Sequence, residues 1–476
     1  MPGPLPLGVY IEDGRFPAVL SDEDAMWEWC KARLSLPERA RGAASSRSSA
    51  PNTEGTLGSA KFEGRQLDDL KLAGWAVLFG AQTSPEIKRR LKPLIEFRRQ
   101  QSNRSNFRVF DGGRFGFKPG QTAAQWLAQI GISANTAVPE DQPFYVMIVA
   151  SPDDIPFQFQ YELDSEFGVG RLWLEKPEDY AVYAEAVIEN EQAGHAPGSS
   201  PSRVRRELRF FAPRFAGDQA TELVCSDLVE RLIRKRKIGA DCGFKAAVTS
   251  GKKATRDALV DLYARQKDRP AIYFPASHGV LCAPAYGELG NIMGAILAEP
   301  WEAGTTPKPN SYMAAHHLKP DTDLRGTFHV LCACYGAGWP QVSSYSNQPV
   351  APAPMMARLP QAILAKGALG VLGHVDEAWS YSYIGSDDGK GIDRTQEYES
   401  ILYRLMNGAR AGHATDEFNR RWSELGGQIA EMLRNQMVES AEALHNLWIE
   451  HDDARGYILH GDPAVRLNVD KMAPAE

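Results

Sequence analysis

A histidine and a cysteine, His278 and Cys334, each follow a short apolar run, Ala271–Phe274 in the first case and Phe328–Leu331 in the second. Each run predicts a short buried strand of a parallel sheet. Open α/β sheets build their sites at the carboxyl ends of such strands, so we expect the imidazole and the thiol to lie side by side. A thiol and an imidazole placed together form a nucleophile and a proton-transfer group.

Glycines stand close to both residues, Gly279 directly after His278 and Gly336 two positions after Cys334. A residue without a side chain lets a substrate carbonyl approach backbone N–H groups. The two segments together therefore predict nucleophilic attack on a carbonyl carbon.

Further landmarks occur in a fixed order between residues 143 and 468. Besides the His-Gly and Ala-Cys pairs, the landmarks are Tyr145–Val149, Asp154–Pro156, Val169–Leu172, Pro177–Tyr180, Ala368–Gly373 and Tyr457–Pro463. In this order the sequence resembles the gingipain-type and caspase-like cysteine peptidases, the clan that also holds legumain, clostripain, separase and the bacterial CHAT proteins.

The nucleophile has to be chosen between Cys332 and Cys334. Residues two apart in a strand share a face, so side-chain direction alone does not separate the two sulfurs. The family pattern of a strand, Ala-Cys and a glycine-containing turn implies Cys334. Cys332 would then lie inside the sheet as a small hydrophobic residue.

The resemblance implies a role for each residue of the pair. The Cys334 thiolate attacks the scissile carbonyl, and His278 protonates the leaving amine and later activates water. The backbone N–H groups of Gly279 and Cys334 are the implied oxyanion donors. No third catalytic member can be identified from the sequence.

The resemblance also implies a specificity pocket. Arginine-specific gingipains carry an Asp shortly before the strand that here contains Gly170-Arg171, and Asp164 fits this position best, with Glu162 as its rival. Trp379 falls where that family has an aromatic wall. Together these residues imply cleavage after Arg or Lys; the alternative is that Asp164 is an exposed loop acid.

A metal site is a weaker interpretation, because Cys-x-Cys without a second paired set lacks zinc-site spacing. We expect a core position for His329, an exposed loop for His316 and His317, and either a pocket or a structural position for His374. The sequence has no P-loop and no G-x-G-x-x-G after a strand, so we expect no cofactor.

Composition is typical of a globular enzyme of two or three domain-sized units. The 476 residues are 43% hydrophobic and 24% charged, with a net charge of −7, so we expect no nucleic-acid partner. The N-terminus has no positively charged and apolar leader, and no stretch approaches the ~20 apolar residues of a membrane span. Six irregularly spaced cysteines fit a reducing compartment. We therefore expect a cytoplasmic protein that does not bind membranes, whereas the gingipains are secreted.

Strands alternating with helices predict an α/β fold, and the resemblance specifies a caspase-like doubly wound, mostly parallel sheet flanked by helices. The predicted parts are an extension at 1–70, a smaller α/β subdomain at 71–192, a linker at 193–206 and a catalytic subdomain at 207–470. The extension begins with a short strand and an amphipathic segment at 22–34, and it contains a polar insert at 40–56. The linker is either a plain loop or a processing site.

The resulting hypothesis is a regulated cysteine endopeptidase that acts on protein or peptide substrates and is activated by a partner protein, proteolysis or a small signal molecule. A part in stress response or anti-phage defence follows only by analogy with the CHAT and caspase relatives. The alternative is a catalytically silent member of the fold that senses a ligand or serves as a scaffold. The sequence also predicts two C-terminal helices, at 395–406 and 416–447.

Overall fold

The structure is a computed structural model, and it describes residues 4–35, 67–132, 142–192, 203–265, 267–284, 289–387 and 390–475. The predicted polar insert at 40–56 and most of the predicted linker at 193–206 lie outside these residues. In the described part, no helix combines the length and the apolar character that crossing a bilayer requires.

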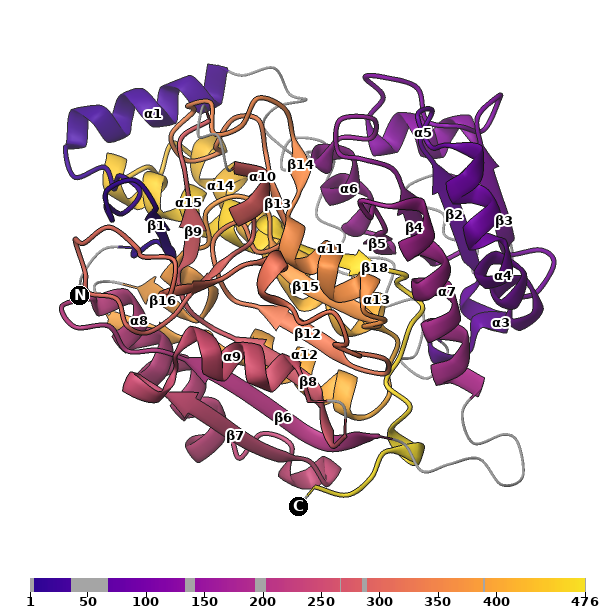
Figure 1. The fold of residues 1–476 in the computed structure, drawn as a ribbon. Helices are drawn as coiled ribbons and strands as arrows, with labels where there is room; N and C mark the ends of the chain where they lie inside the picture. The colour runs from indigo at the N-terminus through magenta and orange to yellow at the C-terminus, as the bar shows by residue number, and fades with distance from the viewer. Residues whose placement is uncertain are drawn as a thin grey trace.

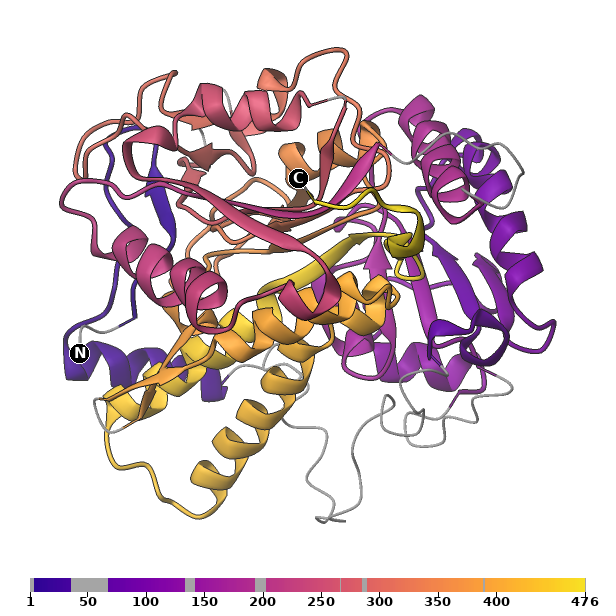
Figure 2. The ribbon, with the colours of Figure 1, turned by 90° about the horizontal axis from the view of Figure 1, so that it is seen from below.

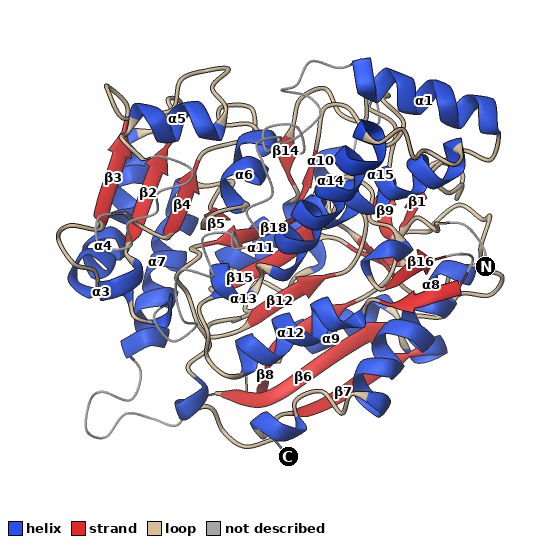
Figure 3. Cartoon of the chain, turned by 180° about the vertical axis from the view of Figure 1, so that it is seen from behind, coloured by secondary structure: helices blue, strands red, loops and turns tan. Residues whose placement is uncertain are grey.

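One ten-stranded sheet forms the centre of the molecule (Figures 1 and 3). Neighbouring strands are parallel except for the β15–β18 pair. The predicted α/β class with a mostly parallel central sheet is confirmed. The strands, in spatial order, are β3 (Phe107–Asp111), β2 (Trp75–Phe79), β4 (Tyr145–Val149), β5 (Gly168–Arg171), β18 (Tyr457–Gly461), β15 (Gly370–His374), β12 (Phe328–Leu331), β8 (Arg269–Pro275), β6 (Val204–Ala212) and β7 (Lys245–Ser250).

Helices cover both faces of this sheet (Figure 2). Strands and helices alternate along the chain, as in doubly wound folds. The helices that matter for the site and its support are α1 (Glu23–Ser35), α4 (Pro85–Gln101), α6 (Phe157–Asp164), α7 (Pro177–Gln192), α8 (Gln219–Leu223), α9 (Arg256–Tyr263), α12 (Thr395–Met406), α14 (Glu417–Arg434) and α15 (Ala441–Gly456).

Strands from both predicted subdomains join in this one sheet. β5 pairs with β18, and Arg171 lies opposite His460 in the register. β2 and β4 are buried along their whole length, as expected of strands covered on both faces. α4 begins as predicted, with Pro85 in its first turn and the Ser84 side chain accepting a hydrogen bond from the Ile87 N–H.

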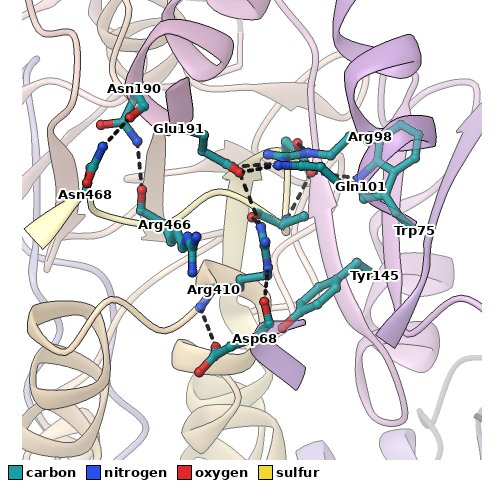
Figure 4. Close-up of polar contacts among 12 residues, drawn as sticks. Asp68, Trp75, Arg98, Gln101, Tyr145, Asn190, Glu191, Arg410, Arg466 and Asn468 are labelled. Carbon is teal, nitrogen blue, oxygen red and sulfur yellow. Dashed lines mark hydrogen bonds and ion pairs between the residues drawn. The ribbon is translucent and has the colours of Figure 1, made fainter. Parts of the chain in front are cut away.

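A buried ionic cluster joins helices of the first subdomain to the end of the last strand (Figure 4). The Arg98 guanidinium on α4 lies 2.7 Å from an Asp462 carboxylate oxygen and 2.8 Å from a Glu191 carboxylate oxygen on α7. Trp75 donates its indole N–H to Asp462 at 2.9 Å. Buried charges require such partners, so the cluster holds the two parts in one arrangement.

The predicted helix at 416–447 is wrong, because the chain forms two helices there. α14 ends at Arg434 and α15 begins at Ala441, with the Ser440 side chain accepting from the Ala443 N–H as its cap. Between them Gln436 takes a positive φ of 55°. The break lets Ile429 on α14 pack with Leu444 and Trp448 on α15. Trp29 and Cys30 on α1 belong to the same buried hydrophobic cluster.

A second, four-stranded sheet holds the first described segment against the main sheet. β1 (Gly8–Tyr10) runs parallel to β9 (Gly279–Leu281), which is followed in the sheet by β10 (Ile296–Leu297) and β11 (Tyr312–Met313). Beyond β1, helix α1 packs on α15 (Figure 1), where Arg33 pairs with Asp452. The strand and the amphipathic segment predicted for the extension thus correspond to β1 and α1. These two elements anchor the residues that lie between them in the sequence.

Candidate active site

The strands that carry the histidine and the cysteine are parallel neighbours, as predicted. β8 pairs with β12, and the pairing continues past their ends to a bridge between Ala276 and Cys332. His278 and Cys334 each lie two residues beyond this bridge. The structure therefore brings both residues to the same edge of the sheet, at equivalent positions on adjacent strands.

The Cys334 thiol is completely buried. Its sulfur accepts a hydrogen bond from the Ala378 N–H at 3.1 Å and lies 3.4 Å from the Ala378 carbonyl oxygen. Burial, followed by the negative charges of Glu377 and Asp376, raises the pKa of this thiol well above its ordinary value. In this arrangement the sulfur is a protonated thiol.

His278 is completely buried, and a carboxylate holds one side of its ring. The Nε2 atom lies 2.8 Å from Asp218 Oδ2. Burial opposes ionisation of Asp218, but the charge of His278 and hydrogen bonds from Thr221 outweigh it and lower the Asp218 pKa to about 2. Among the described residues, the Nδ1 atom has no hydrogen-bond partner. Asp218 therefore orients the ring and leaves Nδ1 for proton exchange.

Asp218 is the functional residue that the sequence analysis missed. It caps helix α8 by accepting from the Ala220 and Thr221 N–H groups, and it follows β6, which pairs with the histidine-bearing β8. The sequence feature that could have indicated this role is an acid shortly after the strand that neighbours β8. The two residues are 60 positions apart in the sequence, so no local motif connects them.

The second cysteine lies in the core behind the site. The Cys332 sulfur accepts a hydrogen bond from the Tyr398 hydroxyl at 3.4 Å, and burial raises its pKa to about 12. This placement suits a small hydrophobic residue.

The backbone N–H groups of Gly279 and Cys334 converge on one point. Both donate to a single carbonyl oxygen, that of Leu7, with each nitrogen 2.9 Å away. A side chain on Gly279 would collide with the Cys334 backbone, since an added methyl would lie 2.0 Å from its carbonyl oxygen. The glycine therefore permits the close approach of the two donors.

Trp379 lies beside the site, but not as an open wall. Its side chain is buried, with its ring centroid 5.3 Å from that of Tyr345. The backbone N–H of Trp379 donates to Asp453 Oδ1 at 2.8 Å, and its backbone also forms an antiparallel bridge with Pro6. Trp379 thus contributes backbone to the segment that lines the site.

Asp164 and Glu162 lie elsewhere, on α6. Asp164 is buried and accepts from the Val169 N–H at 3.0 Å, and burial raises its pKa well above the ordinary value. Glu162 accepts from the Ala123 N–H. Asp164 precedes β5, which is three strands from β12 in the sheet, or about 14 Å at the usual strand spacing. Asp164 is therefore neither an exposed loop acid nor a neighbour of Cys334.

The other histidines considered in the sequence analysis have structural contacts, and His316 and His317 lie in a short 3-10 turn, Ala315–His317, where His316 is exposed and His317 half-buried. His329 stacks on Tyr273 with ring centroids 4.6 Å apart, and burial lowers its pKa to about 3, which fits the predicted core position. His374 is buried and bridges the backbone carbonyls of Asp376 and Asp453. His317 accepts from the Ala314 N–H. Among the described residues, no group of His, Cys, Asp and Glu could hold a metal ion.

Comparison with known proteins gives similarity in structure only. No protein-family model and no curated protein matches the sequence. A solved structure of a protease is 13% identical with a TM-score of 0.49, and the match covers 83% of this chain and 78% of that one. Two structures of the Saccharomyces cerevisiae separase–securin complex are 12% and 10% identical with TM-scores of 0.34 and 0.32. Each separase match covers 71% of this chain but only 16% and 17% of the respective separase chain. At these values the similarity assigns no activity, partner or residue role.

Proposed function

We propose that this chain is a cysteine peptidase that hydrolyses peptide bonds through Cys334 and His278. The observation that carries the proposal is the convergence of two backbone N–H groups, from Gly279 and Cys334, on one carbonyl oxygen beside the Cys334 thiol. Preorganised donors of this kind stabilise the oxyanion of acyl transfer. The His278 ring, held by Asp218, supplies the proton-transfer group.

The proposed reaction uses each of these groups in turn. His278 takes the proton of the Cys334 thiol, and the thiolate adds to the scissile carbonyl carbon. The negative oxygen is stabilised by the two N–H groups, and the bond to nitrogen breaks as His278 protonates the leaving amine. Water, deprotonated by His278, then hydrolyses the thioester and restores the thiol. Asp218 stabilises the imidazolium at each step.

Basic specificity has only the resemblance as support. The buried position of Asp164 on α6 gives no support to a role in binding an Arg or Lys side chain. The acids whose charges act on the thiol are instead Asp376 and Glu377. A regulated role in stress response or anti-phage defence likewise follows from the resemblance alone.

Hydrolysis of a peptide library, read by mass spectrometry after long incubation at high enzyme concentration, tests the proposal. Cleavage should persist in Cys332→Ala and disappear in both Cys334→Ala and His278→Ala, because the latter two belong to one catalytic unit. Cleavage by Cys334→Ala would contradict the assignment. A protein whose Cys334 is open to a thiol reagent and that still cleaves no peptide would favour the catalytically silent alternative.

A further inference from the structure

The carbonyl oxygen on which the two N–H groups converge belongs to the chain itself. It is the oxygen of the Leu7–Gly8 peptide bond, with both nitrogens at 2.9 Å, a distance typical of oxyanion-hole donors. The candidate active site is therefore occupied by a group of the same chemistry as a substrate's scissile carbonyl.

The residues before this bond pair with the wall of the site as an antiparallel strand. The Leu7 N–H donates to the Ala378 carbonyl at 2.8 Å, and the Ser380 N–H donates to the Leu5 carbonyl at 2.9 Å. The Leu5 N–H donates to the Ser380 hydroxyl at 3.1 Å. Main-chain pairing of this kind holds an extended peptide in one direction and register.

The residue after the bond lies against the thiol. A methyl group added to Gly8 would be 2.9 Å from the Cys334 sulfur and 2.5 Å from a Leu281 methyl. Such distances are shorter than van der Waals contact, so this position excludes a branched side chain. Beyond it the chain continues as β1, paired in parallel with β9.

Further contacts cover the histidine and hold the segment down. The Phe16 ring lies 5.4 Å from the His278 ring, and the Glu12 carboxylate accepts from the Ala283 N–H at 2.6 Å. The Leu7 side chain is completely buried within the main hydrophobic cluster. The segment thus excludes both solvent and any other peptide from the site.

We infer that residues Leu5–Gly8 occupy the substrate cleft in the direction and register of a peptide substrate, and that they block it. The inference rests on the proposed function and extends it to a substrate class. The cleft takes extended peptides with an apolar residue before the reacting bond and glycine after it. External peptides gain access only when residues 4–16 leave the site.

The first test measures access to the thiol and does not depend on catalysis. Gly8→Val should force the segment away from Cys334, whereas Val19→Ala, the control, changes an exposed residue that follows residues 4–16. Alkylation of Cys334 by iodoacetamide, followed by mass spectrometry, should be at least about tenfold faster in Gly8→Val, since reactivity scales with the open fraction. Equal rates in both variants would overturn the inference.

A second form of the protein keeps the test valid if Gly8→Val does not fold. The chain is exposed at Ala18 and Val19, so a recognition site for a sequence-specific protease can be placed there and cut after folding. Cutting and then removing the released peptide should accelerate Cys334 alkylation, and circular dichroism before and after checks that the fold persists. A folded protein that has lost the peptide, as shown by mass spectrometry, and is alkylated at an unchanged rate would contradict occupancy of the cleft.

The substrate class is tested on the opened protein with two peptide aldehydes, acetyl-Leu-Pro-Leu-al and acetyl-Leu-Pro-Arg-al. The leucine aldehyde should protect Cys334 from alkylation at a concentration at least about tenfold lower, in line with the differential burial of one apolar side chain. Tighter binding of the arginine aldehyde would overturn the inferred class. Faster alkylation without hydrolysis of any peptide would reject the proposed peptidase and leave the occupied cleft standing.

Discussion

The charge on the Cys334 sulfur depends on a few side chains around it. Burial and the acids Glu377 and Asp376 keep the thiol protonated, and burial raises the pKa of Asp376 itself to about 6. On the other side of the site, Asp218 lies 2.8 Å from the His278 ring. The site therefore opposes a free thiolate, and the proposed mechanism assigns the thiol proton to His278 only once a substrate is bound.

Asp218→Asn should lower kcat by a factor on the order of 10²–10⁴, the usual contribution of general acid–base catalysis. Asn is as good a helix cap as Asp, so α8 should persist while the charge that stabilises the imidazolium is lost. Steady-state kinetics of the opened protein on a peptide substrate should show a lower kcat at similar KM, and Asp218→Glu should regain part of the activity. A higher KM with unchanged kcat would indicate that Asp218 acts only on binding.

Glu377→Gln should lower the pKa of the Cys334 thiol, because the ionised form of Glu377 is the group that most opposes thiol ionisation after burial, although burial and Asp376 raise the pKa of Glu377 itself. The pH dependence of iodoacetamide alkylation at Cys334 measures this value, and the midpoint should move to lower pH. Glu162→Gln on α6 is the matched control and should leave the midpoint unchanged. A midpoint that moves equally in both variants would refute a local effect of Glu377.

At the scale of elements, the sequence predicted what depends on local pattern. The apolar runs that end before His278 and Cys334 are β8 and β12, and the pairing of these strands is confirmed. The contact of Asp218 with His278 and the pairing of β1 with β9 join residues far apart in sequence. Hydrophobic periodicity does not encode such contacts. For the same reason, the sequence analysis predicted one helix at 416–447, where the structure has α14 and α15 with a turn between them.

α15 supports the wall of the site through Asp453. This buried carboxylate accepts from the Trp379 N–H and the Ser382 hydroxyl, and burial raises its pKa to about 7. The native state therefore keeps a proton that the unfolded chain loses near pH 4. Between about pH 4 and pH 7 this group lowers the free energy of unfolding as pH rises, by up to about 1.4 kcal/mol per pH unit.

Asp453→Asn should remove that pH-dependent contribution while retaining an acceptor for the Trp379 N–H. Urea unfolding of both proteins between pH 4.5 and 7 measures the effect as a difference in slope. The variant should gain stability relative to the wild type as pH rises. Parallel curves would show that Asp453 does not titrate in this window.

At the scale of the whole molecule, one sheet spans both predicted subdomains, with the β5–β18 pair at their junction. The buried charges of Arg98, Glu191 and Asp462 lie across the same junction (Figure 4). The wall of the site follows β15, the neighbour of β18. The strands that carry the site, β8, β12 and β15, therefore all lie on the same side of this junction.

Arg98→Met should lower the free energy of unfolding by about 3–5 kcal/mol, because it leaves the buried Asp462 carboxylate without its counter-charge and leaves Glu191 with only Arg410, 3.7 Å away. Arg99→Met, the neighbouring residue on α4, removes only an exposed pair with Glu96 and should leave unfolding unchanged. Chemical denaturation followed by tryptophan fluorescence and circular dichroism gives both values. The two signals should change together, since the parts share one sheet and one ionic cluster. Two separate transitions in the wild type, or equal losses in the two variants, would show that the cluster does not couple the parts.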